Sequence, residues 1–160
     1  MSVAFFLTLA VFSVLLTLSA IAQLLYLESL RLRSREYDAL DYFKENLESR
    51  LGMKIERGAL TYSLLKHGLI ALMGIFALAL LGASRGEHFW YAIAEAAVLA
   101  WVLCTVFAHI LPQLLYRHTS GKWLFAFLPV LLAMKWAISP VVAILKFFQS
   151  LTELRNGHEE

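Results

Sequence analysis

Long apolar stretches alternate with short polar segments along the whole chain. The first stretch, residues 1–27, contains no charged residue, and it exceeds the roughly 20 apolar residues that a helix needs to cross ~30 Å of hydrocarbon. Stretches 58–83 and 89–115 are nearly as apolar. A soluble fold of 160 residues leaves much of its surface wet and could not bury this much apolar surface. The pattern predicts an all-α integral membrane protein.

Three of the apolar stretches are long enough to span a bilayer, and two further segments have the pattern of helices at its cytoplasmic side. Together they predict one transmembrane domain, residues 1–151, followed by a polar tail, 152–160. The expected transmembrane helices cover about 3–30, 58–83 and 89–116, and the expected juxtamembrane helices cover about 35–51 and 123–150.

The segment 35–51 carries one apolar stripe. Leu40, Phe43, Leu47 and Leu51 recur at steps of three and four residues, which is the period of a helix face. We therefore expect an amphipathic helix that lies on the inner membrane surface or against a partner. An ordinary solvated connector helix is the alternative, because such a stripe is not specific for lipid.

The last apolar stretch, Trp123–Phe148, differs from the others. Pro129, Lys135 and Pro140 divide it into pieces that are each too short to span alone. A proline also disfavours helical backbone in the residue before it. These breaks favour a broken helical belt at the membrane interface, and a Pro-kinked transmembrane helix is the alternative.

The distribution of Lys and Arg predicts the orientation. Seven of the 14 basic residues fall between Arg31 and Arg57, whereas the short segment 84–87 has only Arg85. Basic loops stay cytoplasmic, so we expect the N-terminus outside, in a plasma membrane such as the bacterial inner membrane. Ala20-Ile21-Ala22 resembles a signal-peptidase site, but no basic residue precedes this run and it exceeds the usual h-region. We expect it to remain as an anchor.

Composition excludes several function classes. Hydrophobic residues make up 60% of the chain, against about 45–50% in soluble proteins. The net charge of +2 does not indicate a nucleic-acid partner. Cys104 is the only cysteine, so no intrachain disulfide can form. Because no enzyme motif stands out, we do not expect an enzyme.

Polar residues within the apolar stretches are the candidate functional groups, since ionisable groups at membrane depth are unfavourable. Counting about 1.5 Å per residue from the nearest cytoplasmic arginine, Ser19 lies about 18 Å, Lys66 about 14 Å and His109 about 12 Å inside. His67 adjoins Lys66. Three different spans therefore place polar groups at a similar level of the cytoplasmic half.

In the third span, Glu95, Val102, His109 and Tyr116 follow at seven-residue steps, with Gln113 four positions after His109. This spacing predicts one seam that faces a neighbouring helix. A row of small residues suited to close helix packing flanks the seam: Ala92, Ala96 and Ala100.

Pro112 removes the backbone hydrogen bond to Ala108 and so frees a carbonyl beside His109 for a ligand, a water or a side chain. His109 itself has three interpretations: a metal ligand, a proton-responsive group, or a polar residue bonded to a neighbouring helix. Lys66 is interpreted as paired or reaching to the interface, and its charge disfavours a bare divalent cation nearby.

Two motifs resemble the transmembrane domain of the CNNM/CorC family. They are Leu27-Glu28-Ser29-Leu30-Arg31-Leu32 at the end of the first span and Phe107-Ala108-His109-Ile110-Leu111-Pro112-Gln113 in the third. The resemblance extends over about residues 5–150. It implies a dimeric magnesium or cobalt transport or efflux protein with three spans and a cytoplasmic helical belt.

The resemblance also implies where an ion would bind. Ser19 is the nearest match to the family's serine on the first span, Lys66-His67 falls on the asparagine region of the second, and His109 replaces the motif glutamate. Gln113 replaces the motif lysine. Magnesium requires oxygen ligands in near-octahedral geometry, so we do not expect the family's magnesium site to survive these replacements.

We therefore expect a divergent ion transporter with a degenerate magnesium site. One alternative is a non-transporting scaffold or regulatory subunit on the same fold. Another is a soft-metal or proton-linked carrier that uses His67 and His109 as metal ligands or proton acceptors. Magnesium or another divalent cation is implied by the resemblance only. The expected partners are membrane lipid and a second copy or related membrane domain, forming a homodimer or heterodimer.

Overall fold

The computed structural model describes residues 3–31, 37–85 and 89–156, and every regular element in these ranges is helical. The prediction of an all-α chain is confirmed. The elements are α1 (Val3–Leu30), α2 (Asp38–Tyr42), the π-helix η1 (Phe43–Leu47), α3 (Glu48–Leu51), α4 (Ile55–Arg85), α5 (Phe89–Cys104), the π-helix η2 (Thr105–Ile110), α6 (Leu111–His118), the 3-10 helix η3 (Lys122–Phe125) and α7 (Leu128–Asn156).

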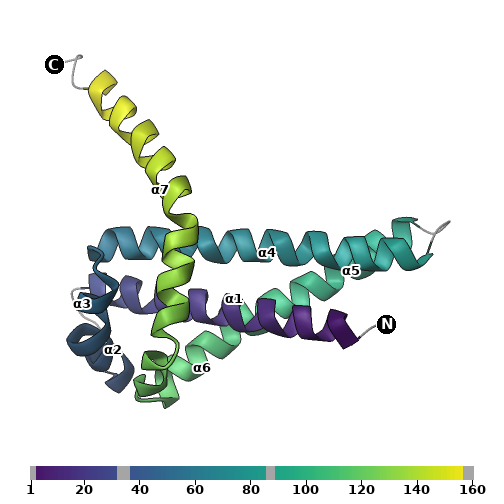
Figure 1. Cartoon of the computed structure of the whole chain (residues 1–160), viewed down its shortest axis with the longest axis horizontal. Helices are drawn as coiled ribbons and strands as arrows, with labels where there is room; N and C mark the ends of the chain where they lie inside the picture. The colour runs from purple at the N-terminus through teal and green to yellow at the C-terminus, as the bar shows by residue number, and fades with distance from the viewer. Residues whose placement is uncertain (1–2, 32–36, 86–88, 157–160) are drawn as a thin grey trace.

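Four helical segments within the described residues are long and apolar enough to cross a membrane: Phe5–Leu30, Ile55–Ala79, Trp90–His118 and Leu128–Leu145. The third of these joins α5, η2 and α6 into one helical rod. In Figure 1, α1 and α4 run side by side, α5 packs along the far end of α4, and α6 returns beside α1. The helix α7 lies across α1 and α4 instead of running along them.

The main core forms where α1, α4 and the α2–α3 segment meet. Tyr26 of α1 is completely buried; its ring meets the edge of Phe43 at a centroid distance of 4.9 Å and stacks on Tyr62 of α4 at 5.9 Å. Gly58 lies directly beneath this ring, and a Cβ atom there would overlap it. Glycine at position 58 is therefore what allows α1 and α4 to approach with an aromatic ring between them.

The predicted apolar stripe is buried against the chain itself. Leu40, Phe43, Leu47 and Leu51 are each at most 2% exposed and belong to the same core cluster as Tyr26. The expectation that this face covers lipid or a partner is wrong, because the ends of α1 and α4 fill it. Of the predicted segment 35–51, the first two residues lie outside the described ranges.

The predicted break of the last apolar stretch is present only before Pro129, where η3 has ended and α7 begins; the prediction of breaks at Lys135 and Pro140 is wrong, since α7 is one helix of 29 residues. Pro129 is its second residue, where the first-turn N–H has no helical partner in any case. Pro140 stands inside the helix and removes one hydrogen bond, which is a common cause of bending. The helix changes direction partway along its length (Figure 1). It also continues to Asn156, into the segment predicted as a polar tail.

Two hydrogen bonds attach α7 to the rest of the protein. The Lys135 ammonium donates to the backbone carbonyl of Leu51 at 2.6 Å, at the C-terminus of α3. The Tyr62 hydroxyl donates to the carbonyl of Leu131 at 3.2 Å. A cation at a helix C-terminus is favourable because the last carbonyls lack helical partners. Lys135 is therefore a structural residue and not an interruption of the helix.

The predicted seam of the third span is only partly a contact face. Tyr116 is buried, whereas Val102 and His109 are exposed; the inward face of α5 is formed instead by Ala92 and Ala96, which are at most 3% exposed. A seven-residue repeat assumes unbroken α-helix. In the π-helix η2 each backbone hydrogen bond spans five residues, so a turn contains more residues than in an α-helix. The helix faces before and after η2 are therefore not related by a seven-residue repeat.

The Tyr26–Gly58 contact predicts the effect of a single methyl group. Gly58→Ala should lower the free energy of unfolding by about 1–3 kcal/mol, because the Tyr26 ring must leave its site. Gly68→Ala is the matched control on the same helix, since a Cβ there meets nothing within 4 Å; it should be neutral or stabilise by up to about 1 kcal/mol. Thermal melting of both variants in detergent checks this, and equal melting temperatures would contradict it.

The Lys135 contact generates a second prediction. Lys135→Met should cost about 1.5–3 kcal/mol, the range for a hydrogen bond to a charged group, and it should loosen α7 from α3. Lys122→Met, at an exposed position, removes the same charge without this contact and should change stability by less than about 0.5 kcal/mol. Unfolding by denaturant, together with hydrogen exchange at Leu51–Lys54, measures both effects.

Candidate functional site

A small pocket opens between α1 and the η2–α6 segment and reaches α4. Its volume is about 110 Å³. We call it the Lys66 pocket, and its lining residues are Ala20, Gln23, Leu24, Leu27, Lys66, Ala108, His109, Pro112 and Gln113.

The Lys66 pocket unites several of the residues singled out from the sequence. Lys66 of α4, His109 of η2 and Gln113 of α6 all line it, with Pro112 between the latter two. The sequence reasoning missed Gln23 of α1, which supplies a second carboxamide. The available signal was a polar residue within an otherwise apolar run, one helical turn after Ser19.

Two predicted residues lie outside the pocket lining. Ser19 is completely buried, and its hydroxyl donates to the carbonyl of Leu15 on the same helix at 2.9 Å. His67 is exposed, with its Nδ1 2.7 Å from the carbonyl of Ser63. The structure therefore brings together Lys66, His109 and Gln113, and it does not bring His67 to His109.

Pro112 leaves the carbonyl of Phe107 without a backbone donor, and not that of Ala108 as predicted, because the turn before it is π-helical. In the π-helical turn, the Leu111 N–H donates to the carbonyl of Val106, five residues back. The next bond in this register would join residue 112 to Phe107, and proline has no N–H to form it. The Thr17 hydroxyl of α1 lies 3.2 Å from the Phe107 carbonyl and 2.9 Å from the carbonyl of Ser13 on its own helix, so its single proton is shared between these two acceptors. This contact between helices holds His109 and Gln113 over α1.

The side-chain groups that line the Lys66 pocket are poor ligands for a hard divalent cation. The lining offers two carboxamides, one imidazole and one ammonium, and no carboxylate. Among the described residues, no group of three or more His, Cys, Asp or Glu side chains could hold a metal ion. Magnesium prefers carboxylate and carbonyl oxygens, and a lysine in the lining repels it.

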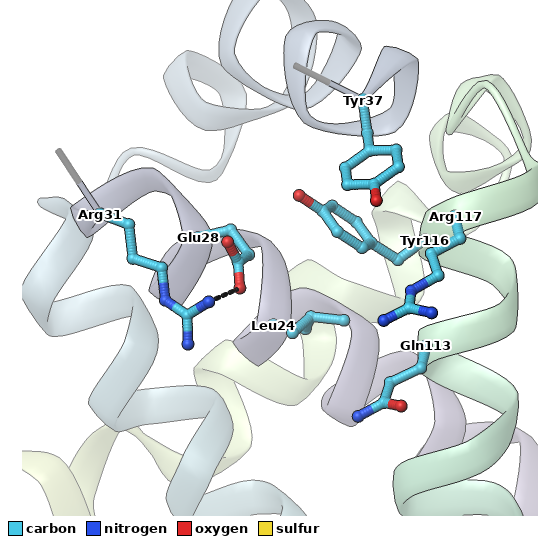
Figure 2. Close-up of a pocket in the computed structure, with 7 residues that line it drawn as sticks. All are labelled: Leu24, Glu28, Arg31, Tyr37, Gln113, Tyr116 and Arg117. Carbon is cyan, nitrogen blue, oxygen red and sulfur yellow. Dashed lines mark ion pairs between the residues drawn. The ribbon is translucent and has the colours of Figure 1, made fainter. Parts of the chain in front are cut away.

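A larger pocket adjoins the first and shares Leu24 and Gln113 with it. Its volume is about 430 Å³, and we call it the Arg117 pocket. Figure 2 shows its lining residues: Leu24, Glu28, Arg31, Tyr37, Gln113, Tyr116 and Arg117. Sequence reasoning used Arg31 and Arg117 only as markers of membrane depth. Their common position at the ends of two spans was the signal that they could meet.

No family model matches the chain, and no curated protein or solved structure matches it either. The chemistry of the two pockets therefore carries the functional argument.

The Thr17 contact can be tested by a double-mutant cycle. Thr17→Val should cost about 0.5–1.5 kcal/mol, because it removes the hydroxyl that the Phe107 and Ser13 carbonyls share. In a Pro112→Ala background the same change should cost less, since the new backbone N–H can bond the freed carbonyl. Denaturation of the four proteins measures the coupling.

Thr105→Val is the control for this cycle. The Thr105 hydroxyl donates to the Trp101 carbonyl of its own helix, so its loss should change stability by less than about 0.5 kcal/mol. Additive effects of Thr17→Val and Pro112→Ala would show that the hydroxyl does not serve the carbonyl that proline frees.

Proposed function

We propose that the protein is a three-span membrane protein of CNNM/CorC-like layout that serves as a non-transporting scaffold or regulatory subunit for a second copy or a related membrane domain. Its polar site does not accept a bare divalent cation. The observation that carries this proposal is the lining of the Lys66 pocket, whose described residues include a lysine and a histidine but no carboxylate.

The arrangement of helices supports three spans with a belt. The helix α4 has 31 residues, or about 46 Å at 1.5 Å per residue, which exceeds ~30 Å of hydrocarbon. Lys66 precedes Arg85 by 19 residues, or about 28 Å, so Lys66 would lie at one edge of the hydrocarbon. The bond between Tyr62 and Leu131 joins α7 to α4 one turn from Lys66, and the crosswise direction of α7 suits an interfacial position (Figure 1).

The positions of the basic residues support the proposed orientation of the protein in the membrane. The proposed belt is α7. Three arginines lie at helix ends on its side of the protein: Arg31 after α1, Arg57 near the start of α4 and Arg117 near the end of α6. The excess of Arg and Lys at this end favours the cytoplasmic side, with the N-terminus outside. The exposed apolar face of α5, which includes Trp101 at 70% exposure, is available to lipid or to the second subunit.

The chemistry of the Lys66 pocket supports a role without cation transport. The Lys66 ammonium can itself occupy the position of a bound cation, with the carboxamide oxygens of Gln23 and Gln113 as acceptors in the same lining. A tethered cation cannot be carried across a membrane. The separation of His67 from the pocket also gives no support to a carrier that uses both histidines.

Metal titration tests the proposal. Isothermal titration of the purified protein with magnesium and cobalt should show no saturable binding, and proteoliposomes should show no magnesium flux. The double variant Lys66→Asn with His109→Glu should gain saturable magnesium binding, because it removes one positive charge and adds a carboxylate.

His67→Asn with His109→Glu is the matched control. It adds the same carboxylate but keeps Lys66 in the pocket, so it should not gain magnesium binding. Magnesium flux through the unmodified protein would overturn the proposal. Saturable zinc binding lost in both His67→Asn and His109→Asn would favour the histidine carrier instead.

A further inference from the structure

The Arg117 pocket has a lining that differs from that of the Lys66 pocket. It lies where α1 and α6 end, and Tyr37, just before α2, closes one side. Figure 2 shows Arg117 and Gln113 extending from α6 toward Leu24 of α1. The two pockets form one groove, and the Arg117 pocket is the larger part of it.

Positive charge exceeds negative charge in this lining. Arg31 donates to Glu28 at 2.8 Å, and the Glu28 side chain is only 13% exposed. Arg117 has no hydrogen-bond or ion-pair partner within the described part of the chain, although it lines the same pocket. Both guanidinium groups stay charged at physiological pH, and each presents several planar N–H donors. With one carboxylate against two guanidinium groups, the pocket favours an anion.

A buried hydroxyl in the same pocket also lacks a partner. Tyr116 is 6% exposed, and its hydroxyl has no hydrogen-bond partner among the described residues. Its ring packs on Tyr37 at a centroid distance of 4.9 Å and reaches toward the side where Glu28 and Arg31 lie (Figure 2). Buried hydroxyl groups normally form a hydrogen bond. The oxygen is enclosed in this structure, so the Tyr116 hydroxyl becomes a donor to a bound ligand once the neighbouring Tyr37 ring shifts.

The position of the pocket indicates the source of the anion. Arg31 directly follows α1, and Arg117 is the penultimate residue of α6, so both stand where apolar helices leave the hydrocarbon. Basic pockets between transmembrane helices at the cytoplasmic side are suited to phosphate-bearing lipid headgroups. The volume of about 430 Å³ falls within the range of small-molecule sites, which leaves space for a headgroup beyond its phosphate.

We propose that the Arg117 pocket binds a phosphate group between Arg117 and Arg31, with Tyr116 and Gln113 as neutral donors. A singly charged phosphodiester, as in an anionic lipid headgroup, matches the net charge of the lining. Arginine forms paired hydrogen bonds with phosphate oxygens. This inference does not depend on whether the Lys66 pocket conducts ions, so the two proposals can fail separately.

The test uses the full-length protein in detergent, titrated with short-chain phosphatidylglycerol. Saturable binding is expected, with at least about tenfold weaker binding to zwitterionic phosphatidylcholine. Arg117→Gln should weaken phosphatidylglycerol binding about tenfold or more, the size expected for loss of a charged hydrogen bond. Lys122→Gln, which removes an equal charge outside the pocket lining, should leave it within about twofold.

The Tyr116→Phe variant distinguishes a role of the hydroxyl in lipid binding from a role in protein stability. Its hydroxyl has no protein partner, so the melting temperature without lipid should not fall, whereas phosphatidylglycerol binding should weaken about threefold to tenfold. Inorganic phosphate is titrated in parallel. Binding of inorganic phosphate that depends on Arg117 supports the site. If phosphatidylglycerol does not bind as well, the ligand of the site is soluble phosphate. Equal losses in Arg117→Gln and Lys122→Gln, or no binding of either probe, would overturn the proposal.

Discussion

The close approach of α1 and α4 at Tyr26 and Gly58 is the constraint on which the remaining architecture depends. The ring is completely buried and leaves no space for a side chain at position 58. Phe43 packs on its edge and Tyr62 on its face, so one residue of α1 determines where the α2–α3 segment and α4 lie. Tyr62 in turn bonds Leu131. The cluster thus connects two long helices, the short helices and α7 through aromatic packing, whose geometry is specific.

The groove follows from this arrangement. Once α1 and α4 are paired, Thr17 holds the π-helical turn through the Phe107 carbonyl, and the groove forms along α1 from Lys66 to Arg117. Among the described lining residues, the cationic groups outnumber the carboxylates, of which Glu28 is the one present. That charge balance is unfavourable for a divalent cation and favourable for phosphate. The two adjoining pockets share Gln113, but the cation proposal depends on Lys66 and His109 and the phosphate proposal on Arg117 and Tyr116.

The helical class and the positions of the long helices could be predicted from sequence, since apolar runs of this length satisfy their backbone groups in hydrocarbon only as helices. The apolar stripe that begins at Leu40 could also be predicted from the sequence. The surface that it packs against could not, because lipid and the end of another helix are both apolar. The helix also continues through Pro140, against the prediction. A proline removes one backbone hydrogen bond, but local adjustment and neighbouring groups can compensate for it, so its presence does not show whether a helix ends there.

For the site, counting the rise along each helix predicted a common level for Ser19, Lys66 and His109, and helical spacing added Gln113. Of these four, Lys66, His109 and Gln113 line one pocket. Which way each side chain points was decided only by the tertiary structure. Rotation about a helix axis depends on packing and on irregular turns such as Thr105–Ile110, so residues at equal depth can face different neighbours. That is why Ser19 turns into the core and is absent from the groove.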